Sequence, residues 1–316
     1  MTVVSLFPSA TELAAALGAT PAAVSHQCDR PAAVEDRPTL TGLVRDLDAD
    51  PAAIDRIAAH DGTYYLDGDR LAAADPDVIL TQGVCAVCAL DAGLAHRAVE
   101  RLDLDAAVLD VHADDLDDVL ANVERVGEAV DRPATAADLR ADLDARIDAV
   151  AEAVPAGDAV ASADAGEAVS ADARPRVAVL DWTDPLRHAG LWVPDLIRVA
   201  GGEPGLVASG ERSRKVDPDE LRAFDPEVVV VGPCSADVDE AERAAADLLA
   251  RESLDDVAAV RDGRVYAMDG TAYLNRHSHR VVDTLEALAA VVHPDRFEGT
   301  DEKVRRVDGG AAGPST

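Results

Sequence analysis

Two cysteines three positions apart raise the first chemical possibility in this sequence. Cys85 and Cys88 stand in "TQGVCAVCAL", directly after an apolar run that predicts a buried strand. A Cys-x-x-Cys pair supplies half of a usual zinc site, and the other half could come from the same part of the chain or from Cys234. A metal site is therefore one hypothesis. Its candidate ligands are Cys85, Cys88, Cys28 and His26.

The same pair allows two other interpretations. Cys85 precedes the predicted helix "LDAGLAHRAVERL", and a helix N-terminus favours the reactive thiolate, which would suit redox chemistry. Half-buried cysteines also act as small apolar side chains that line a pocket. The sequence has no second Cys-x-x-Cys, no His-x-x-x-His and no thioredoxin-like neighbourhood. Metal binding, redox chemistry and pocket lining all stay open.

Acid–base catalysis has weaker support. Asp181, Asp184 and His188 lie close together in the sequence, but no nucleophile elbow, phosphate loop or carboxylate pair of defined spacing accompanies them. We expect His188, His277 and His279 to lie at the surface or at the rim of a site. The sequence predicts a binding protein and not an enzyme.

The elements that would position these residues follow an alternating pattern. Short β-branched runs are separated by longer stretches with apolar residues three and four apart, such as "LDDVLANVERVGEAV". This alternation predicts βαβ units on mostly parallel sheets. The expected strands are 3–7, 22–26, 77–82, 106–111, 176–182, 227–232 and 264–270.

An internal repeat favours two lobes. "DRLAAADPDVIL" (69–80) resembles "DELRAFDPEVVV" (219–230). In each copy we expect a helix to end before Pro76 or Pro226 and a strand buried on both faces to follow. The predicted organisation is an N-terminal α/β lobe at 1–132, a bridging helix at 133–155, a low-complexity loop at 156–174, a C-terminal α/β lobe at 175–296 and a flexible tail at 297–316.

The loops after the predicted strands hold all four cysteines and much of the aromatic content. Ligands of parallel α/β sheets bind at the carboxyl ends of the strands. Because the chain has only nine aromatic residues, their concentration there indicates a large, flat, partly apolar ligand. The alternative is that the two tryptophans fill a lobe core. The aromatic residues of these loops are Phe7, Trp182, Trp192 and Tyr273, and Tyr64 and Tyr65 lie just before the predicted helix that starts at Asp69.

The charge balance excludes some partners. Asp and Glu number 61 against 29 Lys and Arg, and a net charge of -32 repels nucleic acid and anionic membrane surfaces. Such acidity is typical of proteins from salt-in halophiles. The sequence shows no signal peptide and no run long enough to insert in a membrane. We expect a cytoplasmic protein, or one at the cell surface if the start codon is misassigned.

Four motifs in order carry a family resemblance. "VVSLFPSATELAAALGA", "DPDVILTQGVCAVCAL", "LDWTDPLRHAGLWVPDLIRVAGG" and "DELRAFDPEVVVVGPC" resemble the cobalamin-binding branch of the substrate-binding proteins of ABC importers. The resemblance covers about 2–295 apart from the low-complexity loop. It implies two Rossmann-like lobes with parallel sheets, joined by a single long helix, and a cobalamin or other corrinoid held between them with little hinge motion.

The resemblance also assigns residues. It implies that Phe7, Ser9 and Thr11 line the N-terminal lobe, that Trp182, Trp192 and Tyr273 line the C-terminal lobe, and that Gln82 and Cys85 close the floor. The wider candidate set adds Cys28, Tyr65, Cys88, Cys234 and Arg276.

In exported members an acidic residue at the start of each repeat helix docks on arginines of the permease. Here these residues are Asp69 and Asp219, for which helix capping is the favoured alternative. The chain departs from the family in lacking a leader, in carrying His277 and His279 where relatives have a Pro-Gly-Pro stretch, and in its Cys-x-x-Cys. A permease partner is therefore only one possibility.

Overall fold

The structure, a computed structural model, divides into two compact units. It describes residues 1–44, 56–58 (backbone only), 64–83, 92–154, 174–299 and 301–307. Cys85, Cys88 and nearly all of the low-complexity loop lie outside these ranges. Unit 1 comprises Met1–Ala113, Asp117–Asp142 and His277–His279, and unit 2 comprises Asp114–Leu116, Leu143–Arg276 and Arg280–Thr316.

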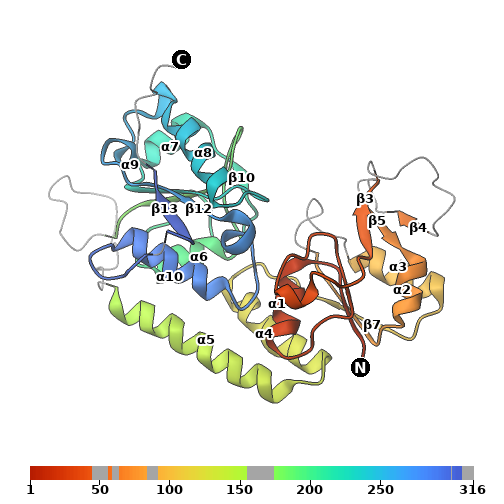
Figure 1. Ribbon diagram of the computed structural model, residues 1–316. Helices are drawn as coiled ribbons and strands as arrows, with labels where there is room; N and C mark the ends of the chain where they lie inside the picture. Colours follow the sequence, from red (N-terminus) through yellow and green to blue (C-terminus); the bar gives the residue numbers. More distant parts are fainter. Residues whose placement is uncertain (45–55, 59–63, 84–91, 155–173, 300, 308–316) are drawn as a thin grey trace. The chain divides into compact units, whose positions relative to one another are not determined.

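Unit 1 is built on a four-stranded parallel sheet with the order β2-β1-β6-β7. The two central strands are buried along their whole length, as expected for strands covered on both faces. Helix α3 packs against β6 and β7, and α2 packs against α3 (Figure 1). The strands are β1 (Val3–Ser5), β2 (Ala23–Val24), β6 (Val78–Thr81) and β7 (Ala107–Asp110); the helices are α1 (Pro8–Ala16), η1 (Ala32–Val34), α2 (Gly68–Ala74), α3 (Ala92–Leu102) and α4 (Leu116–Ala129).

A second sheet in unit 1 was not expected from the sequence. It is antiparallel with the order β3-β5-β4, and it consists of β3 (Thr41–Leu43), β5 (Tyr64–Asp67) and β4 (Arg56–Ala58). Tyr65 lies opposite Gly42, and a Cβ on that glycine would lie 2.6 Å from the Tyr65 hydroxyl. The glycine therefore leaves the space in which the tyrosine ring lies.

Unit 2 has one six-stranded sheet with the order β10-β9-β8-β11-β12-β13. The three central strands are parallel, whereas β9, β10 and β13 pair antiparallel at the edges. The strands are β8 (Val177–Thr183), β9 (Leu186–His188), β10 (Arg214–Lys215), β11 (Val228–Val231), β12 (Val265–Met268) and β13 (Val304–Arg306).

Helices cover both faces of the unit 2 sheet. Figure 1 shows α7, α8 and α9 on one side and α6 and α10 on the other. Apolar residues of α8 join those of the strands in one core cluster. The helices are α6 (Val193–Val199), α7 (Pro218–Phe224), α8 (Val238–Leu249), η3 (Glu252–Leu254), α9 (Ala258–Arg261), the π-helical turn η4 (Gly270–Leu274) and α10 (Val281–Val292).

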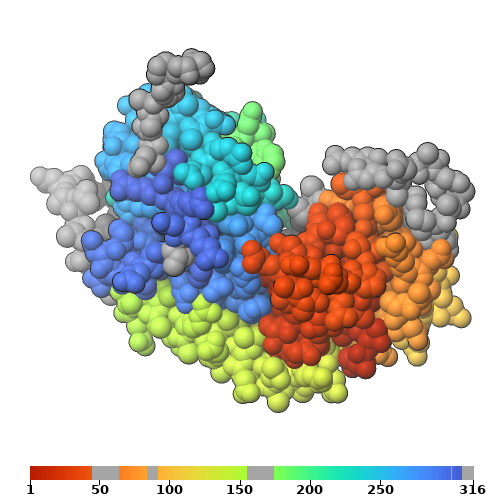
Figure 2. Space-filling view, viewed as in Figure 1, coloured from red at the N-terminus to blue at the C-terminus, as the bar shows by residue number. Residues whose placement is uncertain are grey.

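The longest helix, α5, runs from Pro133 to Ala153, and the boundary between the units falls after Asp142. In unit 2, Arg146 of this helix is paired with Asp283 and Glu286 of α10 at 2.7 and 2.8 Å. Figure 2 shows the yellow-green surface of α5 beside the blue surface of α10. The α/β fold class and the two lobes predicted from the sequence are confirmed.

Two expectations need correction. The stretch after "RVAVLD" was expected to be a loop, but β8 continues to Thr183 and turns into β9, because only two residues separate them. The segment 297–316 was expected to be a flexible tail, but it contains β13, which pairs with β12. Arg305 of β13 also pairs with Asp239 and Glu242 of α8, so charge holds this strand in place as well.

The sequence repeat is matched in the backbone. Helices α2 and α7 each end on an aspartate in the left-handed conformation, Asp75 (φ 44°, ψ 63°) and Asp225 (φ 46°, ψ 63°), and each aspartate is followed by proline. Fully buried strands β6 and β11 then follow. The expected helix stop and buried strand are confirmed in both copies.

The two aspartates give a matched prediction. Asp75→Gly should raise the free energy of unfolding by about 0.5–1 kcal/mol, because glycine removes the left-handed strain. Asp225→Gly should lower it by about 1 kcal/mol, because Asp225 Oδ1 accepts the Ala258 N–H at 2.8 Å and Oδ2 faces Arg176 at 3.4 Å. Urea denaturation measures both, and a stabilised Asp225→Gly would contradict the expectation.

Within the described part of the chain, no helix has the length and apolar character needed to cross a membrane.

Candidate functional site

Trp182 is the large apolar side chain that unit 2 presents most openly at the carboxyl edge of its sheet. The residue is 43% exposed, and Met1 is the one other large hydrophobic residue exposed in the described part of the chain. The indole N–H donates to the Asp184 carbonyl at 2.8 Å. Because this bond fixes one edge of the ring, the indole face is held out as a flat apolar surface.

Three residues beside it come from different strand ends. The Cys234 N–H donates to the Asp181 carbonyl at 3.2 Å, and the Cys234 thiol donates to Asn275 Oδ1 at 3.3 Å. Asn275 in turn donates through Nδ2 to the carbonyls of Gly270 at 2.9 Å and Gly232 at 3.4 Å. The amide orientation is therefore fixed, with its oxygen toward the thiol. Nothing in the sequence pattern distinguishes Asn275, which was missed as a site residue.

The carboxyl group of Asp181 lies partly inside this edge. Burial raises the pKa of Asp181, while Ser213 and the positive charge of Arg187 act in the opposite direction. Its Oδ1 is buried, with no hydrogen bond to it from the described residues. The carboxylate thus pays a desolvation cost that a polar group of a ligand could offset.

The other predicted residues of unit 2 are more enclosed. Trp192, just before α6, is only 6% exposed, which fits the alternative in which a tryptophan fills the core. The Tyr273 ring has the Arg280 guanidinium 4.7 Å and the Lys303 ammonium 5.7 Å from its centroid. Arg276 is buried and donates to the Thr271 carbonyl.

His188 was expected at the surface or rim, and this is wrong. The imidazole is fully buried in β9, where Nε2 accepts the Val179 N–H at 3.2 Å and Nδ1 lies 2.6 Å from the Ala189 carbonyl. Since Nε2 accepts, Nδ1 carries the proton and donates. Burial lowers the pKa of His188 to about 4, so the ring is neutral at pH 7.

In unit 1, the residues around the start of α1 pack against one another. Thr11 Oγ1 donates to the Phe7 carbonyl at 3.0 Å and lies 3.0 Å from Cys28 Sγ. Phe7 stacks on His277 with ring centroids 5.3 Å apart and an angle of 22° between planes. Phe7, Ser9 and Thr11 are buried. The contacts of Thr11 bring Phe7 and Cys28 together at one strand end.

His277 and Ser278 are buried in unit 1, although His277 was expected at a rim. The Ser278 hydroxyl donates to the buried carboxylate of Glu12 in α1 at 2.8 Å. Neither Ser278 nor Glu12 was expected from the sequence to take part in the site. A glutamate inside the apolar run "ATELAAALG" was the available signal.

Of the remaining candidates of unit 1, His26 and Gln82 follow strands of the parallel sheet, whereas Tyr65 lies within β5 of the antiparallel sheet. His26 Nδ1 is 2.7 Å from Thr41 Oγ1, Tyr65 covers Gly42, and Gln82 is buried after β6. No group of three or more potential metal ligands occurs among the described residues. The hypotheses on Cys85 and Cys88 stay predictions, because both cysteines lie outside the described residues.

The side-chain cap expected at Asp69 is made by its neighbour Asp67, which precedes α2 and accepts the Arg70 N–H at 3.0 Å. Asp217 occupies the equivalent position before α7, but its side chain makes no capping hydrogen bond. Asp69 and Asp219 are exposed in the first helical turns, and Asp219 pairs with Arg222. Their docking role stays a prediction.

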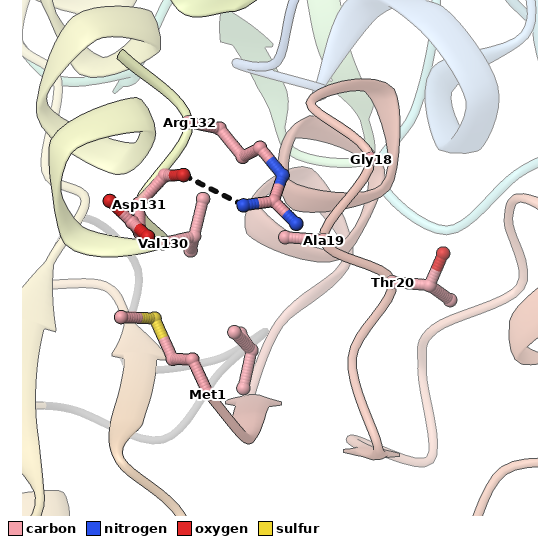
Figure 3. Close-up of a pocket in the computed structure, with 8 residues that line it drawn as sticks. Met1, Gly18, Ala19, Thr20, Val130, Asp131 and Arg132 are labelled. Carbon is pink, nitrogen blue, oxygen red and sulfur yellow. Dashed lines mark hydrogen bonds between the residues drawn. The ribbon is translucent and has the colours of Figure 1, made fainter.

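A hollow of about 280 Å³ lies at the opposite, amino end of the unit 1 sheet. Figure 3 shows Gly18 and Ala19 beside Arg132 in the turn that joins α4 to α5, where Arg132 donates to the Asp131 carbonyl at 2.7 Å. Asp131 and Arg132 are exposed. The strand-end loops lie at the other edge, so this hollow is separate from the candidate site.

A sequence model of the periplasmic binding proteins matches residues 3–272, which is most of the chain. The chain belongs to the periplasmic binding protein family. No functionally curated protein matches the sequence of this family member.

Solved structures of other periplasmic binding proteins share the fold. A periplasmic heme-binding protein from Pseudomonas aeruginosa matches with a TM-score of 0.69 and 20% identity over 97% of this chain and 98% of that chain. The vitamin B12-binding protein BtuF of Vibrio cholerae matches with 0.63 and 16% over 93% and 96%. A possible iron-binding protein from Staphylococcus epidermidis matches with 0.66 and 18% over 92% and 98%. At these identities the likeness shows the fold alone.

Proposed function

We propose that this periplasmic binding protein binds a corrinoid, without catalysis, for uptake, storage or hand-over. The single observation that carries the proposal is Trp182, whose indole is 43% exposed and held by its N–H at the strand end. A flat, partly apolar macrocycle is the kind of ligand that such a ring face would stack on.

The polar groups near Trp182 support the same ligand class. Asp181 offers a carboxylate oxygen that accepts no hydrogen bond from the described residues, which suits the amide substituents on the rim of a corrin ring. Structural relatives that bind vitamin B12 or heme are consistent with a tetrapyrrole-type ligand. Corrinoid and heme are therefore the two ligands to separate by experiment.

A spectral titration in molar KCl separates them. Purified protein is titrated with hydroxocobalamin and, separately, with hemin. Saturable one-to-one binding of hydroxocobalamin, tighter than that of hemin, supports the proposal. Tighter binding of hemin would show that the ligand is a heme and not a corrinoid, although still a tetrapyrrole. If neither compound binds, the fold assignment still holds, but the thiol and metal hypotheses for Cys85 and Cys88 are favoured.

Trp182→Ala tests the stacking surface. We expect it to weaken corrinoid binding by roughly 1–3 kcal/mol, because the ring face is lost. Trp182→Phe keeps an aromatic face but not the N–H, so it should lose less. Isothermal titration of both variants with hydroxocobalamin measures the difference. Unchanged affinity in Trp182→Ala would remove this residue from the site.

Location and partner are part of the proposal. We propose a cytoplasmic protein, with a surface location and an ABC permease as the alternative. An in-frame stop codon shortly upstream of Met1 would exclude an unrecognised leader. If a permease is the partner, charge reversal at the exposed Asp69 and Asp219 should weaken the complex without changing corrinoid affinity.

A further inference from the structure

One pair of metal-ligating side chains in unit 1 lies outside the residues assigned above. Asp110 ends β7 and His112 follows two positions later, at the carboxyl edge of the parallel sheet. Both side chains face Gly83, which follows β6. A Cβ placed on Gly83 would lie 3.0 Å from Asp110 Oδ2 and 3.6 Å from His112 Nδ1. A carboxylate oxygen and an imidazole nitrogen therefore both lie close to the position that a side chain at residue 83 would take.

The carboxylate has an unmet requirement at this position. Asp110 Oδ1 is buried and accepts no hydrogen bond from the described residues. Burying part of a carboxylate without a donor is costly, and an ion or a water is the usual explanation for such a group. A cation bound beside Gly83 would satisfy it.

The backbone on both sides of the pair is held in place by α4. Asn122 Nδ2 donates to the His112 carbonyl at 2.7 Å, and Arg125 Nη2 donates to the Asp110 carbonyl at 3.0 Å. Arg125 also donates to Asn122 Oδ1 at 2.6 Å, which links the two contacts. Between the pair, the Val111 N–H donates to the Thr81 carbonyl at 2.8 Å. The backbone that carries the two side chains is thus held in place, as the backbone under a metal site needs to be.

We propose that Asp110 and His112 bind a divalent transition-metal cation beside Gly83. One carboxylate oxygen and one imidazole nitrogen suit zinc and its neighbours better than calcium or magnesium, which prefer oxygen ligands alone. Gly83 is exposed, so the cation has a route from solvent. Water would complete the coordination. The proposal does not rest on corrinoid binding, although Gly83 directly follows the candidate ligand residue Gln82.

Equilibrium dialysis against Zn²⁺ in molar KCl tests the proposal, because high salt suppresses loose binding to the acidic surface. Wild-type protein should retain one equivalent of Zn²⁺, and Co²⁺ in its place should give visible ligand-field bands. Asp110→Asn and His112→Gln should each weaken binding about 100-fold or more, since each removes a ligand. The matched controls Asp105→Asn and His96→Gln, exposed residues of the same unit, should bind as wild type.

Gly83→Ala provides a variant that keeps both ligands. Its methyl group would occupy the space beside the Asp110 carboxylate, so binding should fall although both donors remain. This variant also decides the question if a ligand variant fails to fold. The proposal is overturned if wild type retains no stoichiometric Zn²⁺, or if Asp110→Asn, His112→Gln and Gly83→Ala all bind as tightly as wild type.

Discussion

Gly270→Ala is expected to lower the free energy of unfolding by about 3 kcal/mol or more. A Cβ at this position would lie 2.0 Å from the Pro233 carbonyl oxygen and 2.9 Å from that of Gly232. Both obstacles are backbone atoms, so no side-chain rotation relieves the overlap. Either η4 or the loop after β11 has to move.

The movement of the backbone that Gly270→Ala requires would also disturb the candidate site. Gly270 accepts from Asn275 at 2.9 Å, and Asn275 holds the Cys234 thiol, so moving η4 disturbs both. Guanidinium denaturation in molar KCl, followed by tryptophan fluorescence, measures the loss. Gly210→Ala is the control, since its Cβ would have nothing within 4 Å but its φ is +79°, so it should lose only about 1 kcal/mol. Equal losses in the two variants would contradict the steric explanation.

His188 is expected to make the protein labile to acid. Its pKa is about 4 in the folded state against an ordinary value of 6.5, so between these pH values the unfolded chain binds a proton that the folded protein does not. The stabilisation is complete above pH 6.5 and is lost as pH falls toward 4. The loss amounts to about 3 kcal/mol.

Urea denaturation of wild type and His188→Gln across pH 4–7 isolates this contribution. The carboxylates titrate in both proteins, so the difference between their unfolding free energies should shrink by about 3 kcal/mol from pH 7 to pH 4. His96→Gln, which alters an exposed histidine on α3, should show a constant difference from wild type. A constant difference for His188→Gln would show that the buried ring is not the acid-sensitive group.

The sequence was informative where local chemistry decides the structure. Proline after a helix and β-branched runs predicted the ends of α2 and α7 and the strands that follow, because these signals act within a few residues. The short strands β3 and β10 carry no such signal. Their pairing depends on long-range partners, such as Gly42 opposite Tyr65, that no local pattern reveals.

The candidate site was predicted less completely for the same reason. The strand-end rule led to Cys28, Cys234 and Trp182 as candidates, but it could not show that Trp182 is exposed and Trp192 buried. That difference depends on the β8–β9 turn, which was expected to be a loop. Asn275, Glu12 and Ser278 were missed because their roles arise from contacts between distant segments.

The hydrogen bond between Ser278 and Glu12 joins residues 266 positions apart, and both belong to unit 1. During synthesis the ribosome adds Ser278 only after it has added all the residues that lie between it and Glu12. Unit 1 therefore cannot reach its final packing before that point, and the stacking of Phe7 on His277 is delayed in the same way. A fragment ending at Asp142 would contain nearly all of unit 1 and still lack the residues that complete it.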